Sequence, residues 1–327
     1  MRYPVSEKLE IIHLVEQSAQ SAKRTLDTLG VPRSTFYVWY DKYLTGGIDA
    51  LEDKISRPSK VWNKIPDNIR EEVVELALDE PELSPREVAV KFTDTKSYFV
   101  SESSVYRLLT ERNLITSPAY ITIKAANEFK DKTTAPNQLW QADFTYLKVT
   151  GWGWFYLSTV LDDYSRYVIA WKLCTNMAAS DVTDTLELAL QTSGCDQLPE
   201  QTKGPRLLSD NGPSYLADEL AQWLDEQNMD HVRGAPYHPQ TQGKIERWHQ
   251  TLKNRILLEN YFLPGDLMNQ IDNFVNHYNH HRYHESLQNL TPADIYFGRG
   301  QSILMERERI KQKTLNQRRL QFRNHAA

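Results

Sequence analysis

Three consecutive segments rich in β-branched and aromatic residues constrain the fold of this chain more than any other feature. They read LWQADFTYLKV from residue 139, WFYLSTVLDD from residue 154 and RYVIAWKLCT from residue 166, with short polar breaks between them. Segments of this kind joined by short turns predict three antiparallel strands in a meander. The middle of the chain is therefore expected to form a β-sheet.

The segments after the meander alternate between helical and strand patterns. We expect a helix, a strand, a second helix and a short strand, at about residues 179–192, 206–210, 214–227 and 229–234. Two long helices follow, at about 241–259 and 265–281. The order βββαβαβα predicts an α/β core, covering residues 135–297, in which helices flank a mixed sheet.

Residues 1–52 have the apolar spacing of three short helices. Before the third helix, Gly30 permits a tight reversal and Ser34 can cap the helix that follows. This pattern is typical of a helix-turn-helix domain, whose later helix enters the DNA major groove. The residues then available for phosphate or base contact are Arg33, Ser34, Thr35 and Tyr37. A three-helix domain without a DNA role would show the same pattern.

A second all-α helix-turn-helix domain, of winged type, is predicted at residues 67–115. Its Ser84-Pro85-Arg86-Glu87 segment is a capping box with proline at the first helical position. Its last helix carries Arg107, a further candidate DNA contact.

The two stretches around this domain, residues 53–66 and 116–134, contain proline and lack periodicity, which indicates linkers. Arg57 and Lys60 in the first linker could follow a phosphate backbone. A linker that is merely solvated fits its composition equally well.

The net charge of −5 hides an uneven distribution. Residues 126–297 carry 13 basic and 22 acidic side chains, whereas residues 298–327 carry eight basic and two acidic ones. The basic helical tail predicts a phosphate-binding arm, and the acidic middle predicts a domain that binds cations. A solvated, charged C-terminal helix remains the alternative.

Composition also excludes several classes of protein. Cys174 and Cys195 form no CxxC pair, so neither a disulfide framework nor a cysteine zinc site is supported. No apolar run approaches the roughly 20 residues that span a bilayer, and the N-terminus lacks the apolar stretch of a secretion signal. We therefore expect a cytoplasmic protein without a membrane partner.

Three carboxylates stand where the predicted core would gather ligands. Asp143 lies within the first strand, Asp210 ends the fourth strand, and Glu246 lies on the helix after the sheet. Carboxylates that converge repel one another unless a cation neutralises them. Ligation by oxygen alone selects Mg²⁺ or Mn²⁺, and two such ions can promote an in-line phosphoryl displacement. Each acid taken alone is more typical of a helix cap or a solvated group.

The spacing of these acids resembles that of a known family. Thirty-five residues separate Asp210 from Glu246, and Lys253 follows Glu246 by two helical turns. The flanking segments PNQLWQADFTYL, LDDYSR, LLSDNGPSY, PYHPQTQGKIERWHQTLK and YNHHRYHESLQNLTPADIY are similar to those of bacterial insertion-sequence transposases, which share the catalytic core of retroviral integrases. The resemblance covers about residues 135–297, and such transposases have similar helix-turn-helix front ends.

The resemblance implies a ribonuclease-H-like fold and a DNA transposase. Asp143 would bridge two Mg²⁺ or Mn²⁺ ions, with Asp210 and Glu246 each completing one site. The enzyme would bind the inverted repeats at the ends of a mobile element, hydrolyse the DNA ends and transfer the 3′-hydroxyls into target DNA. Lys253, Lys244 and Arg247 would contact DNA.

The implied partners are double-stranded DNA and further copies of the chain, as a dimer or higher assembly on DNA. No small-molecule substrate is implied, and the setting would be the bacterial cytoplasm, at the nucleoid. A DNA-binding repressor without cleavage activity and a metal-dependent nuclease of the same fold stay open as alternatives.

Two further groups of residues could compete for a site role. Asp162 and Asp163 fall in a predicted hairpin turn, where aspartates are common. The histidines between residues 277 and 284 could be imagined as a metal site. The resemblance instead assigns packing or DNA contact to Tyr278, Asn279, Arg282 and His284.

Overall fold

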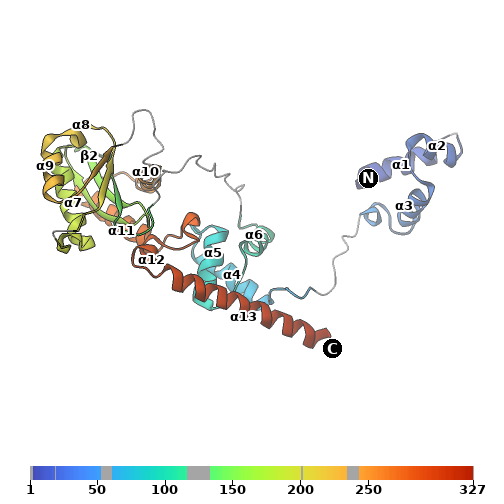
Figure 1. Cartoon of the computed structure of the whole chain (residues 1–327). Coiled ribbons are helices and arrows are strands. Elements are labelled where there is room, and N and C mark those ends of the chain that lie inside the picture. The colour runs from blue at the N-terminus through green and yellow to red at the C-terminus, as the bar shows by residue number, and fades with distance from the viewer. Residues whose placement is uncertain are drawn as a thin grey trace. The chain divides into compact units, whose positions relative to one another are not determined.

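The computed structural model describes residues 3–18, 20–52, 61–115, 133–199, 202–233 and 243–326. The chain divides into two compact units, residues 1–62 and 63–327, coloured along the sequence in Figure 1. Within the described ranges, no helix combines the length and apolar character needed to cross a membrane.

The first unit contains three α-helices and a short 3-10 helix. They are α1 (Val5–Gln17), α2 (Ala22–Leu29), α3 (Arg33–Gly46) and η1 (Ile48–Leu51). The predicted reversal is confirmed, because Gly30 adopts φ +68° and ends α2. The predicted cap on α3 is wrong: the helix begins at Arg33 after Pro32, so Ser34 already lies in the first turn. Proline has a fixed φ that fits the start of a helix without a side-chain cap.

The second unit is built around one mixed sheet. Its strands are β1 (Leu139–Val149), β2 (Gly153–Asp162), β3 (Val168–Cys174), β4 (Arg206–Ser209) and β5 (His231–Arg233), in the spatial order β3-β2-β1-β4-β5. The first three strands pair antiparallel, which confirms the meander, and β4 and β5 run parallel to β1. The α/β core predicted from the element order is therefore confirmed.

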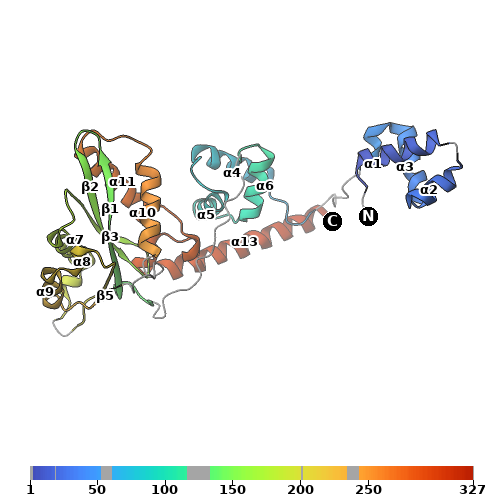
Figure 2. The ribbon, with the colours of Figure 1, turned by 90° about the horizontal axis from the view of Figure 1, so that it is seen from above.

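Helices cover both faces of this sheet, as Figure 2 shows. On one face, α7 (Ala179–Ser193), α8 (Pro213–Leu216) and α9 (Asp218–Glu226) pack on Trp140 and Ala142. On the other face, α10 (Gly243–Ile256) and α11 (Pro264–His280) pack on Leu147 and Val149. The single helix predicted over 214–227 is divided, because Ala217 is extended (ψ 138°) between α8 and α9. Alternate residues of β1 thus serve two separate apolar cores.

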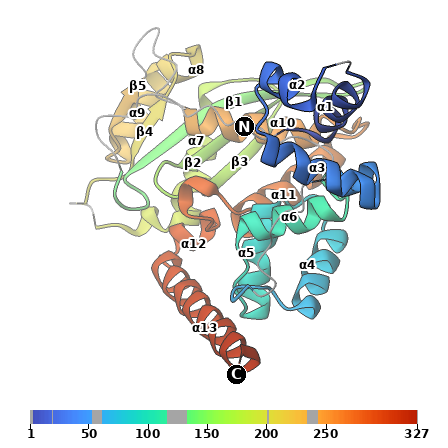
Figure 3. The ribbon, with the colours of Figure 1, turned by 90° about the vertical axis from the view of Figure 1, so that its right-hand side faces the viewer.

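Three further helices of the second unit form the bundle visible in Figure 3. They are α4 (Asp67–Asp79), α5 (Pro85–Lys96) and α6 (Glu102–Glu111), packed around Val73, Phe92 and Val105. The predicted capping box is confirmed, since Ser84 and Glu87 bond to each other's backbone N–H groups. Between residues 61 and 115 the structure describes only helices, so it provides no strand for the predicted wing.

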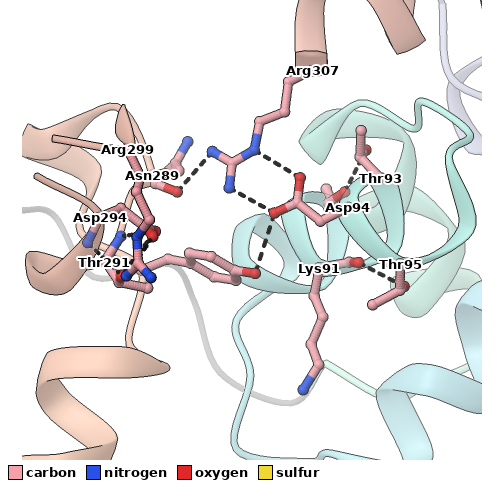
Figure 4. A network of polar contacts seen from close by, with 11 residues as sticks. Lys91, Thr93, Asp94, Thr95, Asn289, Thr291, Asp294, Arg299 and Arg307 are labelled. Carbon is pink, nitrogen blue, oxygen red and sulfur yellow. Dashed lines mark hydrogen bonds and ion pairs between the residues drawn. The ribbon is translucent and has the colours of Figure 1, made fainter. Parts of the chain in front are cut away.

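The C-terminal elements connect the core with this bundle. After η4 (Glu285–Leu287) and α12 (Pro292–Tyr296), the long helix α13 (Gly300–Ala326) packs against α5. Figure 4 shows Arg307 of α13 facing Asp94 of α5, with N–O distances of 2.8 and 2.6 Å. Further along α13, Arg318 is only 5% exposed and donates to Tyr98, Asn63 and the Phe99 carbonyl. Two of the arginines in the basic tail, Arg307 and Arg318, therefore bind the helical bundle.

Candidate active site

Asp143 lies on β1 just past the point where a neighbouring strand stops. Strand β4 pairs with β1 only over Leu139–Gln141, so the carboxylate follows the end of that ladder. One oxygen accepts a hydrogen bond from the Phe144 N–H at 2.8 Å. The other lies 3.4 Å from Nδ1 of His249, a residue of α10 that is 7% exposed. The strand and the helix are thus in contact at this carboxylate.

Glu246 lies on α10 three residues before His249, on the same side of the helix. Although the residue as a whole is exposed, partial burial of its carboxyl group raises the pKa of Glu246. The negative charge of Asp143 raises this pKa further. Two carboxylates, one from β1 and one from α10, therefore share one electrostatic environment.

Asp210 follows β4 and is exposed at the edge of the sheet. Its Oδ1 accepts a hydrogen bond from the Gly212 N–H at 2.9 Å. A Cβ atom added at Gly212 would come within 3.0 Å of that oxygen, so glycine lets the turn fold back on the carboxylate.

Tyr215 connects Asp210 with Asp143. Its ring is buried beside Phe144, and its hydroxyl has no hydrogen-bond partner in the structure. Burial raises the pKa of Tyr215 well above its usual value, and the charges of Asp143 and Asp210 add to the effect. Asp143 thus acts by its charge on Glu246 and shares Tyr215 with Asp210, and we refer to Asp143, Asp210 and Glu246 as the triad.

The triad has the donor chemistry of a divalent cation site. Over the residues that the structure describes, no three His, Cys, Asp or Glu side chains are gathered tightly enough to hold a metal ion as they stand. The charge of Asp143 instead acts on Glu246, and the charges of Asp143 and Asp210 both act on Tyr215. Carboxylate oxygens that repel one another suit Mg²⁺ or Mn²⁺, and a bound cation would relieve that repulsion.

A second group of polar side chains fixes the start of α10 to the sheet. Gln141 of β1 accepts a hydrogen bond from the Ile245 N–H at 3.0 Å and donates to Asp163 at 2.8 Å. Lys244 lies 2.8 Å from the same Asp163 carboxylate and also donates to its backbone carbonyl. Since Ile245 precedes Glu246, these contacts set the position of Glu246 relative to β1.

Asp162 completes this group at the end of β2. Its two oxygens accept from the N–H groups of Asn137 and Ser165 and from the Ser165 hydroxyl. Burial raises the pKa of Asp162, and the bonds from Ser165 and Asn137 only partly offset that effect. Together, Gln141, Asp162, Asp163 and Lys244 form what we call the anchoring cluster. The prediction that both aspartates lie in a turn is thus half right, because Asp162 ends β2 and Asp163 begins the turn.

The predicted DNA contacts lie on several surfaces. Arg33, Ser34 and Tyr37 are exposed on α3, with Thr35 half-buried, and Arg107 is exposed on α6. On α10, Arg247 is exposed and Lys253 is half-buried, with its Nζ 4.1 Å from the centre of the Tyr146 ring. Lys244 is occupied by Asp163. Arg57 and Lys60 lie outside the described residues. Contact of any of these residues with DNA stays a prediction.

The histidine-rich segment packs against the core. Asn279 forms two hydrogen bonds of 2.9 Å with the backbone of Val168, and Tyr278 packs edge-on against Trp248. Burial and nearby arginines lower the pKa of His284 to about 3. These contacts fit the packing role predicted for Tyr278, Asn279 and His284.

Sequence reasoning missed three residues of this region: Gln141, Tyr215 and His249. His249 could have been found from its position three residues after Glu246, on the same helical side. Gln141 shares a strand face with Asp143, at a spacing of two. Tyr215 carries no such signal, because its place near two acids depends on the turn after β4.

Comparison with known proteins identifies the domains. The chain matches two models described as "Integrase core domain", over residues 133–239 and 227–292. It also matches a homeodomain-like domain over residues 35–109 and a helix-turn-helix domain over residues 7–59. The second half of the chain is thus similar to integrase cores, and the part before it is similar to helix-turn-helix domains.

Individual relatives agree with this assignment. Over 167 residues the chain is 29% identical to the transposase InsF of insertion sequence IS3A from Escherichia coli (strain K12), which covers 50% of this chain and 54% of that protein. It is 35% identical over 121 residues to a Gag-Pro-Pol polyprotein of squirrel monkey retrovirus, which covers 37% of this chain and 6% of the polyprotein. The chain therefore spans about half the length of the transposase and a small part of the polyprotein.

A solved structure is similar to part of the chain. The catalytic core domain of HTLV-2 integrase in complex with magnesium is 22% identical and covers 50% of this chain and 99% of that one, with a TM-score of 0.40. Residues 133–292 are thus similar in sequence to integrase core domains, and part of the chain is similar to an insertion-sequence transposase.

Proposed function

From an integrase core preceded by helix-turn-helix domains, we propose that this protein is a DNA transposase. It would bind the inverted repeats of a mobile element, hydrolyse the DNA at the element's ends and join the 3′-hydroxyls to target DNA. The observation that carries the proposal is that Asp143 of β1 acts by its charge on Glu246 of α10, while Asp143 and Asp210 both act by their charges on the buried Tyr215. Carboxylates brought together at one edge of a sheet repel one another, and a bound cation relieves that repulsion.

The triad residues would hold the cation through their carboxylate oxygens. Asp143 would serve two Mg²⁺ ions, while Asp210 and Glu246 would each complete one site. When bound, such ions activate an attacking oxygen and stabilise a leaving one. The protein's part is positioning: the anchoring cluster holds the start of α10, and Gly212 holds the Asp210 carboxylate at the strand end. Lys253 would contact a phosphate near the cleaved end.

The helix-turn-helix domains would choose the DNA. The exposed surface of α3 presents Arg33 and Tyr37, and α6 presents Arg107. Two modules can cover more of a DNA end than one, because each reaches only part of a helical turn. Since two ends must be held together, we expect a dimer or higher assembly on DNA, working at the nucleoid in the bacterial cytoplasm.

Incubation of the full chain with Mg²⁺ and the DNA that borders its own gene, followed by sequencing of the products, tests the proposal. We expect cleavage at defined ends and joined products, both lost when the metal is chelated. Asp210→Asn and Glu246→Gln should abolish both reactions but leave binding of the ends intact. The matched control is Asp272→Asn, which alters an exposed aspartate of α11 and should retain activity.

Other outcomes would point to the alternatives. Cleavage without any joined product would identify a nuclease, and end binding without cleavage would identify a repressor. Near-full activity of Glu246→Gln would exclude Glu246 as a metal ligand.

A further inference from the structure

Next to the triad, two aromatic side chains lie exposed on the β1–β2 hairpin. Tyr146 of β1 is 57% exposed and Trp154 of β2 is 53% exposed. Their ring centroids are 5.4 Å apart, with the planes at 80°. Large aromatic surfaces left open to water are costly and commonly mark a binding surface. The pair is therefore a candidate for a ligand with flat apolar faces.

Two lysines border the same rings. Nζ of Lys253 lies 4.1 Å from the centre of the Tyr146 ring, and Nζ of Lys148 lies 5.9 Å from that of Trp154. We refer to these four residues as the aromatic–lysine platform. Flat faces beside positive charge match a ligand that combines aromatic bases with phosphates.

The platform lies on the same elements as the triad. Tyr146 follows Asp143 by three residues on β1, beyond the point where the ladder to β4 ends. Lys253 follows Glu246 by two helical turns on α10, which contacts β1 along its length (Figure 2). Residues three apart on a strand point to opposite faces, so Tyr146 lies on the other face of β1 from Asp143, but Lys253 of α10 lies against its ring. A DNA strand that passes from the triad along α10 to Lys253 would therefore reach these rings.

We propose that the aromatic–lysine platform stacks the unpaired bases of the DNA strand that enters the active site, with its lysines facing the adjoining phosphates. This inference rests on the proposed function. Where the strands of a duplex end separate, each unpaired base loses a stacking neighbour. An exposed aromatic ring can take the place of that neighbour, and such stacking does not depend on which base it is.

The test compares two probes on the full chain in the absence of divalent metal. One is a duplex with a short single-stranded 3′ overhang that carries 2-aminopurine, and the other is the blunt duplex of the same sequence, taken from the DNA bordering the gene. The wild-type protein should bind the overhang probe more tightly and quench its fluorescence. In Trp154→Ala and Tyr146→Ala this preference should fall about fivefold or more, with the affinity for the blunt duplex unchanged.

Matched variants separate stacking from other effects. Trp154→Phe and Tyr146→Phe should keep the preference, because a ring remains. Trp152→Ala removes a 62% exposed tryptophan of the same hairpin that lies outside the platform, and it should have no effect.

An unchanged preference in both alanine variants, or no preference in a wild-type protein that cleaves DNA, would overturn the inference alone. Loss of self-association in light scattering with the preference intact would also overturn it and would identify a protein interface. A wild-type protein that neither binds nor cleaves DNA would instead overturn the proposed function.

Discussion

The anchoring cluster and the triad both contain acidic side chains on the same sheet, but they differ in how the negative charge is compensated. In the anchoring cluster, Asp162 accepts three hydrogen bonds and Asp163 accepts from Thr133, Gln141 and Lys244. In the triad, by contrast, partial burial and then the negative charge of Asp143 raise the pKa of Glu246. The anchoring cluster supplies hydrogen-bond donors to its carboxylates, whereas the carboxylates of the triad repel one another.

This difference separates structural from functional acids. A buried carboxylate with several donors stabilises a turn and has little capacity left for a ligand. Acids that repel one another at a partly exposed edge oppose folding slightly and gain most from a cation. We therefore expect substitutions in the two clusters to affect different properties: activity in the triad and stability in the anchoring cluster.

The largest expected effect is on catalysis in the triad. Asp143→Asn should reduce DNA cleavage on the order of 10³-fold, since it removes the carboxylate proposed to serve both metal ions. The free energy of unfolding should stay within about 0.5 kcal/mol or rise, because the repulsion on Glu246 is removed. Cleavage assays and urea denaturation measure the two quantities. A clear loss of stability would show that Asp143 belongs with the structural acids.

The fold was largely predictable because its signals are local. Alternation along β1, β2 and β3, the capping box at Ser84 and the glycine turn at Gly30 each depend on a few neighbouring residues. The division between α8 and α9 was missed because Ala217 is a good helix former whose extended conformation is set by the surrounding fold.

The site was predictable in its acids but not in their surroundings. The spacing of Asp210 and Glu246 is visible in the sequence, and so is Lys253. The bond from Ile245 to Gln141 joins residues 104 positions apart, and the one from Lys244 to Asp163 joins residues 81 apart. No local sequence pattern predicts contacts between residues so far apart in the chain. Lys244 shows the consequence, since its sequence position suggests a DNA contact whereas its side chain pairs with Asp163.

The next largest effect is on stability in the anchoring cluster. Asp162→Ala should lower the free energy of unfolding by roughly 2–4 kcal/mol, because it leaves the buried donors of Asn137 and Ser165 without an acceptor. Urea denaturation measures the change, with Asp272→Ala as an exposed control expected to stay within about 0.5 kcal/mol. A loss no greater than that of the control would contradict the structural role of this cluster.

Lys244 and Lys253 both lie on α10, so the structural and the functional region can be compared on a single helix. Lys244→Met should cost about 1 kcal/mol of stability, reduced by the partial exposure of the pair, because Asp163 loses its cation. Lys253→Met should change stability by less than about 0.5 kcal/mol while weakening the binding of DNA ends. Denaturation and anisotropy of labelled end DNA distinguish the two. Equal stability losses would show that both lysines are structural.

The smallest expected effect is a pH dependence of stability that arises because Asp162 is buried although it accepts several hydrogen bonds. Because burial raises the pKa of Asp162, the folded state keeps this proton to a higher pH than the unfolded state does. The stability of the wild-type protein relative to Asp162→Asn should therefore be greatest below the usual aspartate pKa. It should fall as the pH rises through the raised pKa and then level off. Urea denaturation of both proteins over a pH series measures this difference, in which contributions from the other acids cancel. A relative stability that rises over the same interval would mean that the hydrogen bonds from Ser165 and Asn137 outweigh burial and lower the pKa of Asp162. The pKa of Asp162 and that of Glu246 would then be shifted in opposite directions.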